Sequence, residues 1–212
     1  MTPVSPVVLE GRHVQLAPLA FEHVDALAAV ASGPRETFGL TFVPHGPEEV
    51  RAYIAAALEA QAAGTQAPFV IVSRALRRVV GSTRFGGIER WIWPPGHAEQ
   101  RPAGCADAAE IGWTWLSPEV QRTAVNTECK RLLLAHAFEV WRLHRVSLIT
   151  DSRNTRSRAA IERLGATFEG IRRAHFPGPD GAIRDSATFS ILAAEWPAVR
   201  ERLDGLLARQ GR

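Results

Sequence analysis

The order of hydrophobic segments along the chain is the feature that most constrains its fold. Apolar runs and period-two alternation, typical of strands, occur at residues 12–19, 68–73, 79–91, 109–116, 145–150, 168–173 and 183–192. Apolar residues three or four apart, typical of amphipathic helices, occur at residues 20–31, 47–63, 125–141, 154–164 and 195–208. Three early strands follow one another directly, whereas later strands alternate with helices. This order predicts one mixed sheet of about seven strands flanked by helices, an α/β (α+β) fold.

The absence of a long linker indicates a single domain. No repeat, low-complexity tract or long linker divides residues 1–212, so we expect one core over about 8–194 and a C-terminal helix at 195–209. The stretch 93–106 is rich in Pro, Gly and Ala and is too long for a hairpin turn. It is expected to form a surface loop near a functional face.

Composition excludes several classes of protein. A content of 46% hydrophobic and 22% charged residues excludes intrinsic disorder. The net charge is only +3, and Lys130 is the only lysine, so a small arginine surplus gives no indication of direct nucleic-acid binding. Cys105 and Cys129 show no metal-ligand spacing, and no metal is expected. With no secretory signal and no apolar run of about 18 residues, a cytoplasmic protein without membrane contact is expected.

Two strand-to-helix turns are the candidate sites of chemistry, because nucleophile-elbow, zinc-protease, P-loop and dinucleotide motifs are missing. In residues 116–128 a strand runs into a polar turn of small residues that opens a helix. Free N–H groups and the helix dipole at such a turn bind anions, and a pyrophosphate suits them well. Asn126 or Thr127 could equally cap the helix with no ligand at all.

The second turn lies at residues 150–157. Two adjacent strand-to-helix turns in one sheet place two helix N-termini at the same strand ends, the usual location of a ligand crevice. Residues 151–173 also hold six arginines against three acidic residues. A solvated helix face with Glu–Arg pairs would explain part of that excess.

These two turns carry a family resemblance. The first reads Gln121-Arg122-Thr123-Ala124-Val125-Asn126, and the second reads Asn154-Thr155-Arg156-Ser157, followed by Leu164-Gly165-Ala166. In this order, about 30 residues apart, they resemble the cofactor turns of the GCN5-related N-acetyltransferases. The chain is most similar to the branch that includes the ribosomal-protein N-terminal acetyltransferases. The order of elements matches from residue 12 to residue 208.

One departure from the family pattern falls in the first turn. The two glycines of the Gln/Arg-x-x-Gly-x-Gly/Ala loop are replaced by Ala124 and Asn126. Alanine is nearly as small as glycine, and asparagine tolerates left-handed backbone better than most residues. We interpret the turn as a variant cofactor loop; the alternative is weakened or lost CoA binding.

The resemblance implies a single N-acetyltransferase domain with a V-shaped splay between the fourth and fifth strands. Acetyl-CoA would be the co-substrate, and a peptide or small-molecule amine the acceptor. N–H groups of residues 125–127 would hold the pyrophosphate, and the backbone of the strand ending at Leu116 would pair with the pantetheine arm and hold the oxyanion. The cofactor-binding residues implied are Trp115, Leu116, Gln121, Arg122, Thr123, Ala124, Val125, Asn126, Thr127, Asn154 and Ser157.

Catalysis needs a group that deprotonates the amine and one that stabilises the departing thiolate. Many family members use a tyrosine for the thiolate, but Tyr53 is the only tyrosine and lies far from the second turn in sequence. Ser157 is therefore the candidate thiolate stabiliser, with a plain helix-start hydroxyl as the alternative. Glu110 is the candidate base, directly or through water, with a strand-end surface carboxylate as the alternative. Asp151 and Asp185 are weaker candidates.

Acceptor contacts are less well defined by the sequence. Ile111, Trp113 and Trp115 are expected on one face of their strand. Trp91 and Trp93 flank the long loop and line the acceptor site unless they belong to the core. Arg84 and His175 are further candidates.

The sequence also bears on an alternative function and on assembly. The alternative function is a non-catalytic acyl-CoA-binding or protein-interaction module on the same fold. A homodimer is possible through residues 183–192, which are expected to form an edge strand.

Overall fold

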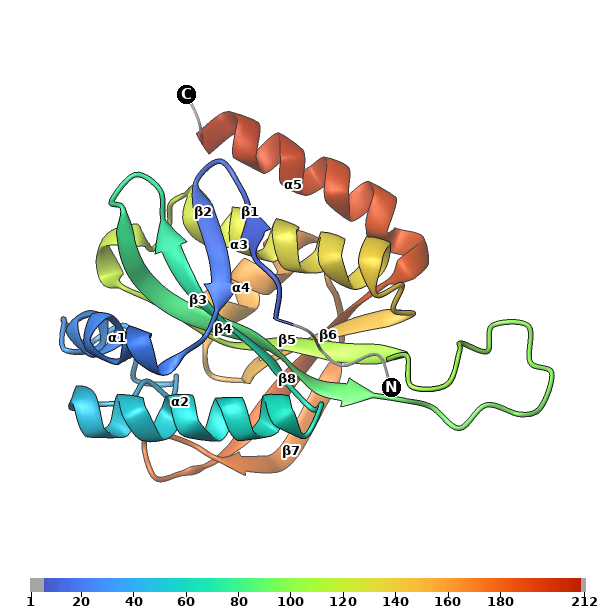
Figure 1. The fold of residues 1–212 in the computed structure, drawn as a ribbon, viewed down its shortest axis with the longest axis horizontal. Helices are drawn as coiled ribbons and strands as arrows, with labels where there is room; N and C mark the ends of the chain where they lie inside the picture. Colours follow the sequence, from blue (N-terminus) through green and yellow to red (C-terminus); the bar gives the residue numbers. More distant parts are fainter. Residues whose placement is uncertain (1–5, 211–212) are drawn as a thin grey trace.

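The computed structural model describes residues 6–210 and contains one mixed sheet (Figure 1). Its order is β1-β2-β3-β4-β5-β6-β8-β7, and all neighbours are antiparallel except β5 and β6. The strands are β1 (Leu9–Glu10), β2 (Val14–Pro18), β3 (Ala67–Ser73), β4 (Arg78–Glu89), β5 (Ala108–Leu116), β6 (Arg145–Asp151), β7 (Thr167–Pro177) and β8 (Ile183–Leu192). The mixed α/β fold is confirmed, with the short β1 added to the seven expected strands.

Helices cover both faces of this sheet (Figure 1). They are α1 (Val24–Ala31), α2 (Gly46–Ala62), α3 (Ala124–Ala135), α4 (Thr155–Leu164) and α5 (Trp196–Gln210). One apolar core joins the sheet to α3 and α5 through residues such as Phe85, Leu133 and Leu203. A second core on the opposite face joins it to α1 and α2 through Leu27, Ile54 and others. None of the helices described in residues 6–210 has the length and apolar character needed to cross a membrane.

The two strands β5 and β6 separate after a short contact. Only three positions pair, Ala108 to Glu110 with Arg145 to Ser147, although both strands continue beyond them. A V-shaped opening therefore lies between their C-terminal halves, as expected between the fourth and fifth predicted strands.

A β-bulge at Trp113 changes which residues of β5 face which core. Trp113 has a φ of +49°, and the register to β4 shifts between the pairs Arg84–Gly112 and Ser82–Trp115. The extra residue reverses the alternation, because side chains point to opposite faces at every step. Ile111 packs on the α3 side and Trp115 on the α1–α2 side. The prediction that Ile111, Trp113 and Trp115 share one face is therefore wrong.

At the end of the sheet beyond β6, the edge strand is β7, not β8. The strand β8 lies between β6 and β7 and is hydrogen-bonded to both. The prediction of an edge strand at residues 183–192 is wrong, because the last hairpin folds back so that its second strand inserts beside β6. Those residues have no free edge for pairing with a second copy.

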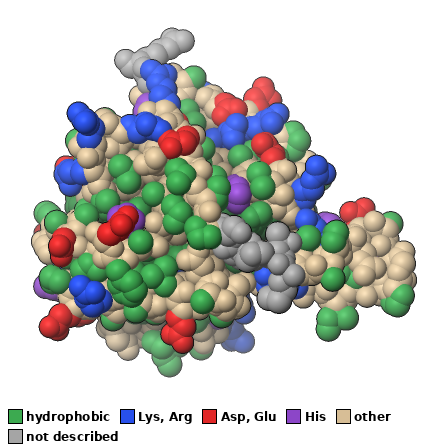
Figure 2. Space-filling view, in the orientation of Figure 1, with side chains coloured by type: hydrophobic (Ala, Val, Ile, Leu, Met, Phe, Trp, Pro, Cys, Tyr) green, Lys and Arg blue, Asp and Glu red, His purple; other side chains and the backbone are tan. Residues whose placement is uncertain are grey.

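The predicted loop at 93–106 projects from the end of β4 and β5 as an arm (Figure 1). At its base the indole of Trp91 stacks on His144, with ring centroids 5.5 Å apart, and the indole N–H of Trp93 donates to Asp107 (3.0 Å). Trp91 and Trp93 thus anchor the arm. Figure 2 shows the arm standing off the domain and acidic and basic side chains interspersed over this face.

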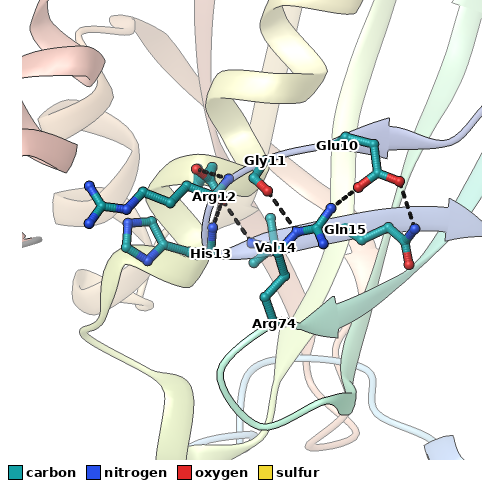
Figure 3. Close-up of polar contacts among 8 residues, drawn as sticks. Glu10, Gly11, Arg12, His13, Val14, Gln15 and Arg74 are labelled. Atoms are coloured by element: carbon teal, nitrogen blue, oxygen red, sulfur yellow. Dashed lines mark hydrogen bonds and ion pairs between the residues drawn. The ribbon is translucent and has the colours of Figure 1, made fainter.

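A buried carboxylate fixes the turn between β1 and β2. Glu128 of α3 is 6% exposed and accepts hydrogen bonds from the backbone N–H groups of Arg12 (2.9 Å), His13 and Val14 (2.7 Å). From the other side, the Arg74 guanidinium donates to the Gly11 carbonyl (2.7 Å) and pairs with Glu10 (Figure 3). This anchor holds the start of the sheet against the helix that begins at the first cofactor turn.

Candidate active site

The first cofactor turn leads into α3 one residue earlier than expected. Thr123 is the N-cap: its hydroxyl accepts from the N–H of Val125 (3.3 Å) and donates to the carbonyl of Val120 (2.7 Å). Neither Asn126 nor Thr127 caps the helix, because both already lie within its first turn.

The left-handed residue of this turn is Arg122, with a φ of +63°. The prediction that Asn126 uses its tolerance of left-handed backbone is wrong, because the backbone at 126 is helical. Asn126 in place of the second glycine therefore carries no conformational cost. Ala124, in place of the first glycine, is the first residue of α3, and alanine is favourable in a helix.

Gln121 joins the two predicted turns. Its side-chain N–H₂ donates to the carbonyl of Leu116 (3.0 Å) and to the hydroxyl of Thr37 (3.0 Å), and its oxygen accepts from Arg156 (2.7 Å). The end of β5, the α1–α2 connection and the first turn of α4 meet at this amide. The structure thus brings together the two segments that the sequence singled out.

The site fits an acyl-CoA on the residues present. In the first turn of α3 the N–H of Val125 donates to the Thr123 cap, while the N–H groups of Ala124 and Asn126 lack intrahelical partners, as at every helix start. Beside them, Asn126 Oδ1 and Thr127 Oγ1 are buried without a hydrogen-bond partner among the described residues. Beyond Glu110, β5 has no strand paired on its β6 side within residues 6–210, which leaves backbone for an extended arm to pair with.

Asn154 and Ser157 occupy the first turn of α4. The Asn154 oxygen caps the helix by accepting from the N–H of Ser157 (3.0 Å), so only its amide N–H₂ remains for a ligand. The Ser157 hydroxyl forms no hydrogen bond with the described residues and is half-buried. It is therefore free to donate toward the V.

Glu110 lies at the vertex of the V. It is the last β5 residue that pairs with β6, opposite Ser147. Burial raises the pKa of its carboxyl to about 7, although Arg184, Arg172 and Lys130 act in the opposite direction. A carboxylate with a pKa near neutrality suits a general base, whereas a solvated strand-end carboxylate would keep its ordinary value.

The two weaker candidates for the base are engaged elsewhere. Arg153 donates to both carboxylate oxygens of Asp151 (2.7 and 3.0 Å), which lowers the pKa of Asp151. Asp185 accepts from the N–H of Ala174 (2.7 Å). Arg153 also pairs with Asp180 (2.8 Å), so part of the arginine excess expected near α4 is neutralised within the chain.

Tyr53 and Lys130 are two residues whose position the sequence did not indicate. Tyr53 projects from α2 onto the end of β5, where its ring contacts Trp115 edge-on (6.3 Å), and its hydroxyl shares a hydrogen bond with Ser82 (3.1 Å). Lys130 is 6% exposed, donates to the hydroxyl of Thr114 (2.6 Å) and has its pKa lowered by burial. Both contacts join residues far apart in sequence.

Comparison with known proteins defines the class to which this fold and site belong. Residues 13–167 match the family described as the acetyltransferase (GNAT) domain. The chain therefore belongs to the GNAT acetyltransferase family, which confirms the resemblance drawn from the two turns.

Individual relatives agree with this assignment. A protein of Bacillus subtilis (strain 168), provisionally named ribosomal N-acetyltransferase YdaF, is 35% identical over 88 residues, or 42% of this chain. The match spans 47%, about half, of that relative's length. A GCN5-related N-acetyltransferase from Brucella melitensis superposes with a TM-score of 0.81 at 28% identity, over 96% of this chain and 86% of that one.

Two further solved structures are similar. A provisionally assigned acetyltransferase from T. thermophilus is 34% identical, with a TM-score of 0.77 over 96% of this chain and 98% of its own. Mycobacterium smegmatis RimJ, solved with CoA-disulfide, shares the fold with a TM-score of 0.80 at 21% identity, over 97% of each chain.

Proposed function

We propose that this protein is an N-acetyltransferase that transfers an acetyl group from acetyl-CoA to a primary amine, by direct attack in a ternary complex. The observation that carries the proposal is Glu110, a half-buried carboxylate with a raised pKa at the vertex of the V between β5 and β6. A base at this vertex can contact an acceptor amine that binds on one side of the sheet, next to a thioester that binds on the other side.

The binding residues follow from the two turns. The N–H groups of Ala124 and Asn126, which lack intrahelical partners, hold the pyrophosphate together with the hydroxyl of Thr127. Arg122 and Thr123 form the turn itself, and the N–H of Val125 donates to the Thr123 cap. The backbone of Trp115 and Leu116 pairs with the pantetheine arm, while Gln121 fixes the turn against α4. The amide of Asn154 contacts the arm from the other side of the V.

When bound, acetyl-CoA supplies an acetyl group activated as a thioester. Glu110 takes a proton from the acceptor ammonium, directly or through water, which leaves a neutral amine. The amine nitrogen then bonds to the acetyl carbon as the carbon–sulfur bond breaks, and a main-chain N–H near Leu116 stabilises the charge on the carbonyl oxygen. One of the two remaining protons on the nitrogen passes to the departing thiolate, so the products are a neutral amide and the CoA thiol. Ser157 donates a hydrogen bond to the departing sulfur.

The acceptor is a peptide N-terminus or a small-molecule amine. The name of the Bacillus subtilis relative favours the peptide. The alternative proposal, a non-catalytic acyl-CoA-binding or interaction module, rests on the absence of a free tyrosine hydroxyl near the second turn among the described residues.

A thiol-release assay separates the two functions. The protein is mixed with acetyl-CoA and a panel of peptides and small amines, and CoA binding is measured in parallel by calorimetry. Acceptor-dependent thiol release supports the enzyme, and CoA binding without release on any acceptor supports the module. Absence of CoA binding rejects both.

A further inference from the structure

Arg84, on the interior strand β4, is a buried charge without an opposite charge. Its side chain is 4% exposed, and only Nη1 has a partner, the Gln66 side-chain oxygen (2.8 Å). Nε and Nη2 are buried and make no hydrogen bond with residues 6–210, and none of the ion pairs in that range includes Arg84. Because arginine stays protonated in proteins and an unpaired buried charge is costly, the position favours an anion that comes from outside the chain.

The free nitrogens have the geometry that a carboxylate requires. Nε and Nη2 carry parallel N–H bonds along one edge of the guanidinium, and this edge binds both oxygens of a carboxylate at once. The flat faces are covered by the rings of Tyr53 (4.5 Å) and Trp113 (5.6 Å). The buried edge of Nε and Nη2 is the part of the group that has no hydrogen-bond partner among residues 6–210.

Arg84 and the proposed base share one face of the sheet. Arg84 pairs with Gly112, and Gly86 pairs with Glu110, so all four residues face the α1–α2 side, opposite to Phe85 and Ile111. Diagonal neighbours on such a face are roughly 7–8 Å apart. A side chain at position 112 would meet the Glu110 carboxylate, since a Cβ there would lie 2.7 Å from Oε1. Glycine at 112 therefore lets the Glu110 carboxylate lie over the residue that pairs with Arg84, which brings the proposed base toward Arg84.

We propose that Arg84 binds a carboxylate of the acceptor, and that this protein prefers amines bearing a carboxylate a few bonds from the reacting nitrogen. The proposal rests on the N-acetyltransferase function proposed above. The carboxylate contacts Nε and Nη2 of Arg84 while the amine lies at Glu110. Two sources share this chemistry: the α-carboxylate of a free amino acid, and an acidic side chain near the N-terminus of a peptide.

The unaltered protein tests the preference through matched acceptor pairs. One pair is a free α-amino acid and its amide, and the other is a short peptide with Glu or Gln at its second position. We expect kcat/KM in thiol release to be about 10–100-fold higher for the carboxylate member of one pair, the range for a charged hydrogen-bonded contact. The pair that shows the difference identifies the source.

Variants then assign the effect to Arg84. In Arg84→Gln, the ratio of kcat/KM between the carboxylate acceptor and its uncharged partner should fall close to one, mainly because KM for the carboxylate acceptor rises. Arg84→Lys should restore part of the preference for the carboxylate. Arg200→Gln, on α5, is the matched control and should leave the ratio unchanged. Calorimetric binding of CoA to each variant shows that the fold and the cofactor site are intact.

Failure of this inference is distinguishable from failure of the proposed function. Turnover with equal kcat/KM in both pairs overturns the role of Arg84 and leaves the N-acetyltransferase standing. If CoA binds but no acceptor is acetylated, the proposed function fails, and calorimetric binding of the same pairs decides the role of Arg84. Tighter binding of a carboxylate member, lost in Arg84→Gln, then supports the inference, and equal binding overturns it.

Discussion

At the scale of single residues, the protonation of Glu110 sets the pH dependence of the reaction. The base must be ionised to accept a proton, so kcat/KM should rise with pH through about 7, the pKa of Glu110. Glu110→Gln should lower kcat about 10²–10⁴-fold and remove this rise. Glu201→Gln, which changes an exposed carboxylate on α5, should do neither. A Glu110→Gln variant with the parent pH profile would assign the base to another group.

The same residue makes stability depend on pH. Because the pKa of Glu110 is higher in the folded protein than its ordinary value of 4.5, the folded state retains a proton that the unfolded state has released. Its contribution to stability is present below about 4.5 and is lost as the pH rises to about 7. Urea unfolding across this range should show a smaller loss of stability in Glu110→Gln than in the parent protein. If the free energy of unfolding fell equally with pH in both proteins, the burial of the Glu110 carboxyl would be contradicted.

Glu128 provides a residue-scale test of the fold. Glu128→Ala leaves three backbone N–H groups without their acceptor and should lower the free energy of unfolding by about 2–4 kcal/mol. Glu10→Ala removes a half-exposed ion pair with Arg74 and should cost less than about 1 kcal/mol. Chemical denaturation of both variants measures the difference, and equal losses would show that the turn does not depend on Glu128.

At the scale of elements, the turn between β5 and α3 depends on one left-handed residue. A side chain at Arg122 raises the energy of its backbone conformation, so Arg122→Gly should be about 1 kcal/mol more stable than Arg122→Ala. The same two substitutions at Arg158, inside α4, should give the opposite order by about 1 kcal/mol. The free energies of unfolding of the four variants test this prediction. If the Gly and Ala variants had the same order of stability at both positions, the backbone at Arg122 would not be strained.

At the scale of the whole molecule, cofactor binding should stabilise the fold. At a concentration 100 times its Kd, CoA should add about 2.7 kcal/mol, which for a chain of 212 residues raises Tm by about 5–10 °C. Pantetheine, which lacks the pyrophosphate, should shift Tm much less, because the N-terminus of α3 then has no anion to bind. Thermal unfolding with each ligand tests this, and equal shifts would argue against the phosphate role of α3.

Most of the fold could be predicted from the sequence because local patterns determine its elements. Pro47 and the acidic residues after it indicate the start of α2, and Gly165 indicates the end of α4. The family resemblance implies a bulge in this strand, but its position at Trp113 could not be predicted, since one extra residue in a strand leaves no compositional trace. The edge position of β7 does leave a trace in the sequence, because its charged residues Glu169, Arg172 and Arg173 are typical of an edge strand, whereas β8 is free of charge from residue 186 onward.

The sequence indicated the two turns of the candidate site and Glu110, but not the contacts that join distant parts of the chain. Gln121 and Asn154 stand in a recognisable local pattern, and the structure joins their segments through Arg156. The pairing of Glu128 with the β1–β2 turn and the contact of Arg84 with Tyr53 join residues far apart in the chain. No local pattern carries such pairings, because they arise only when the sheet assembles.

The burial of Lys130 has a consequence for any reaction mixture that contains this protein. As the only lysine of the 212 residues, and one held inside the domain by Thr114, it leaves the surface without an ε-amino group. Arginine supplies the exposed positive charge, and a guanidinium does not compete with amines for acyl groups. A transferase built in this way offers no exposed lysine for acetylation by itself. Acetyl-lysine formed in its presence therefore belongs to another protein.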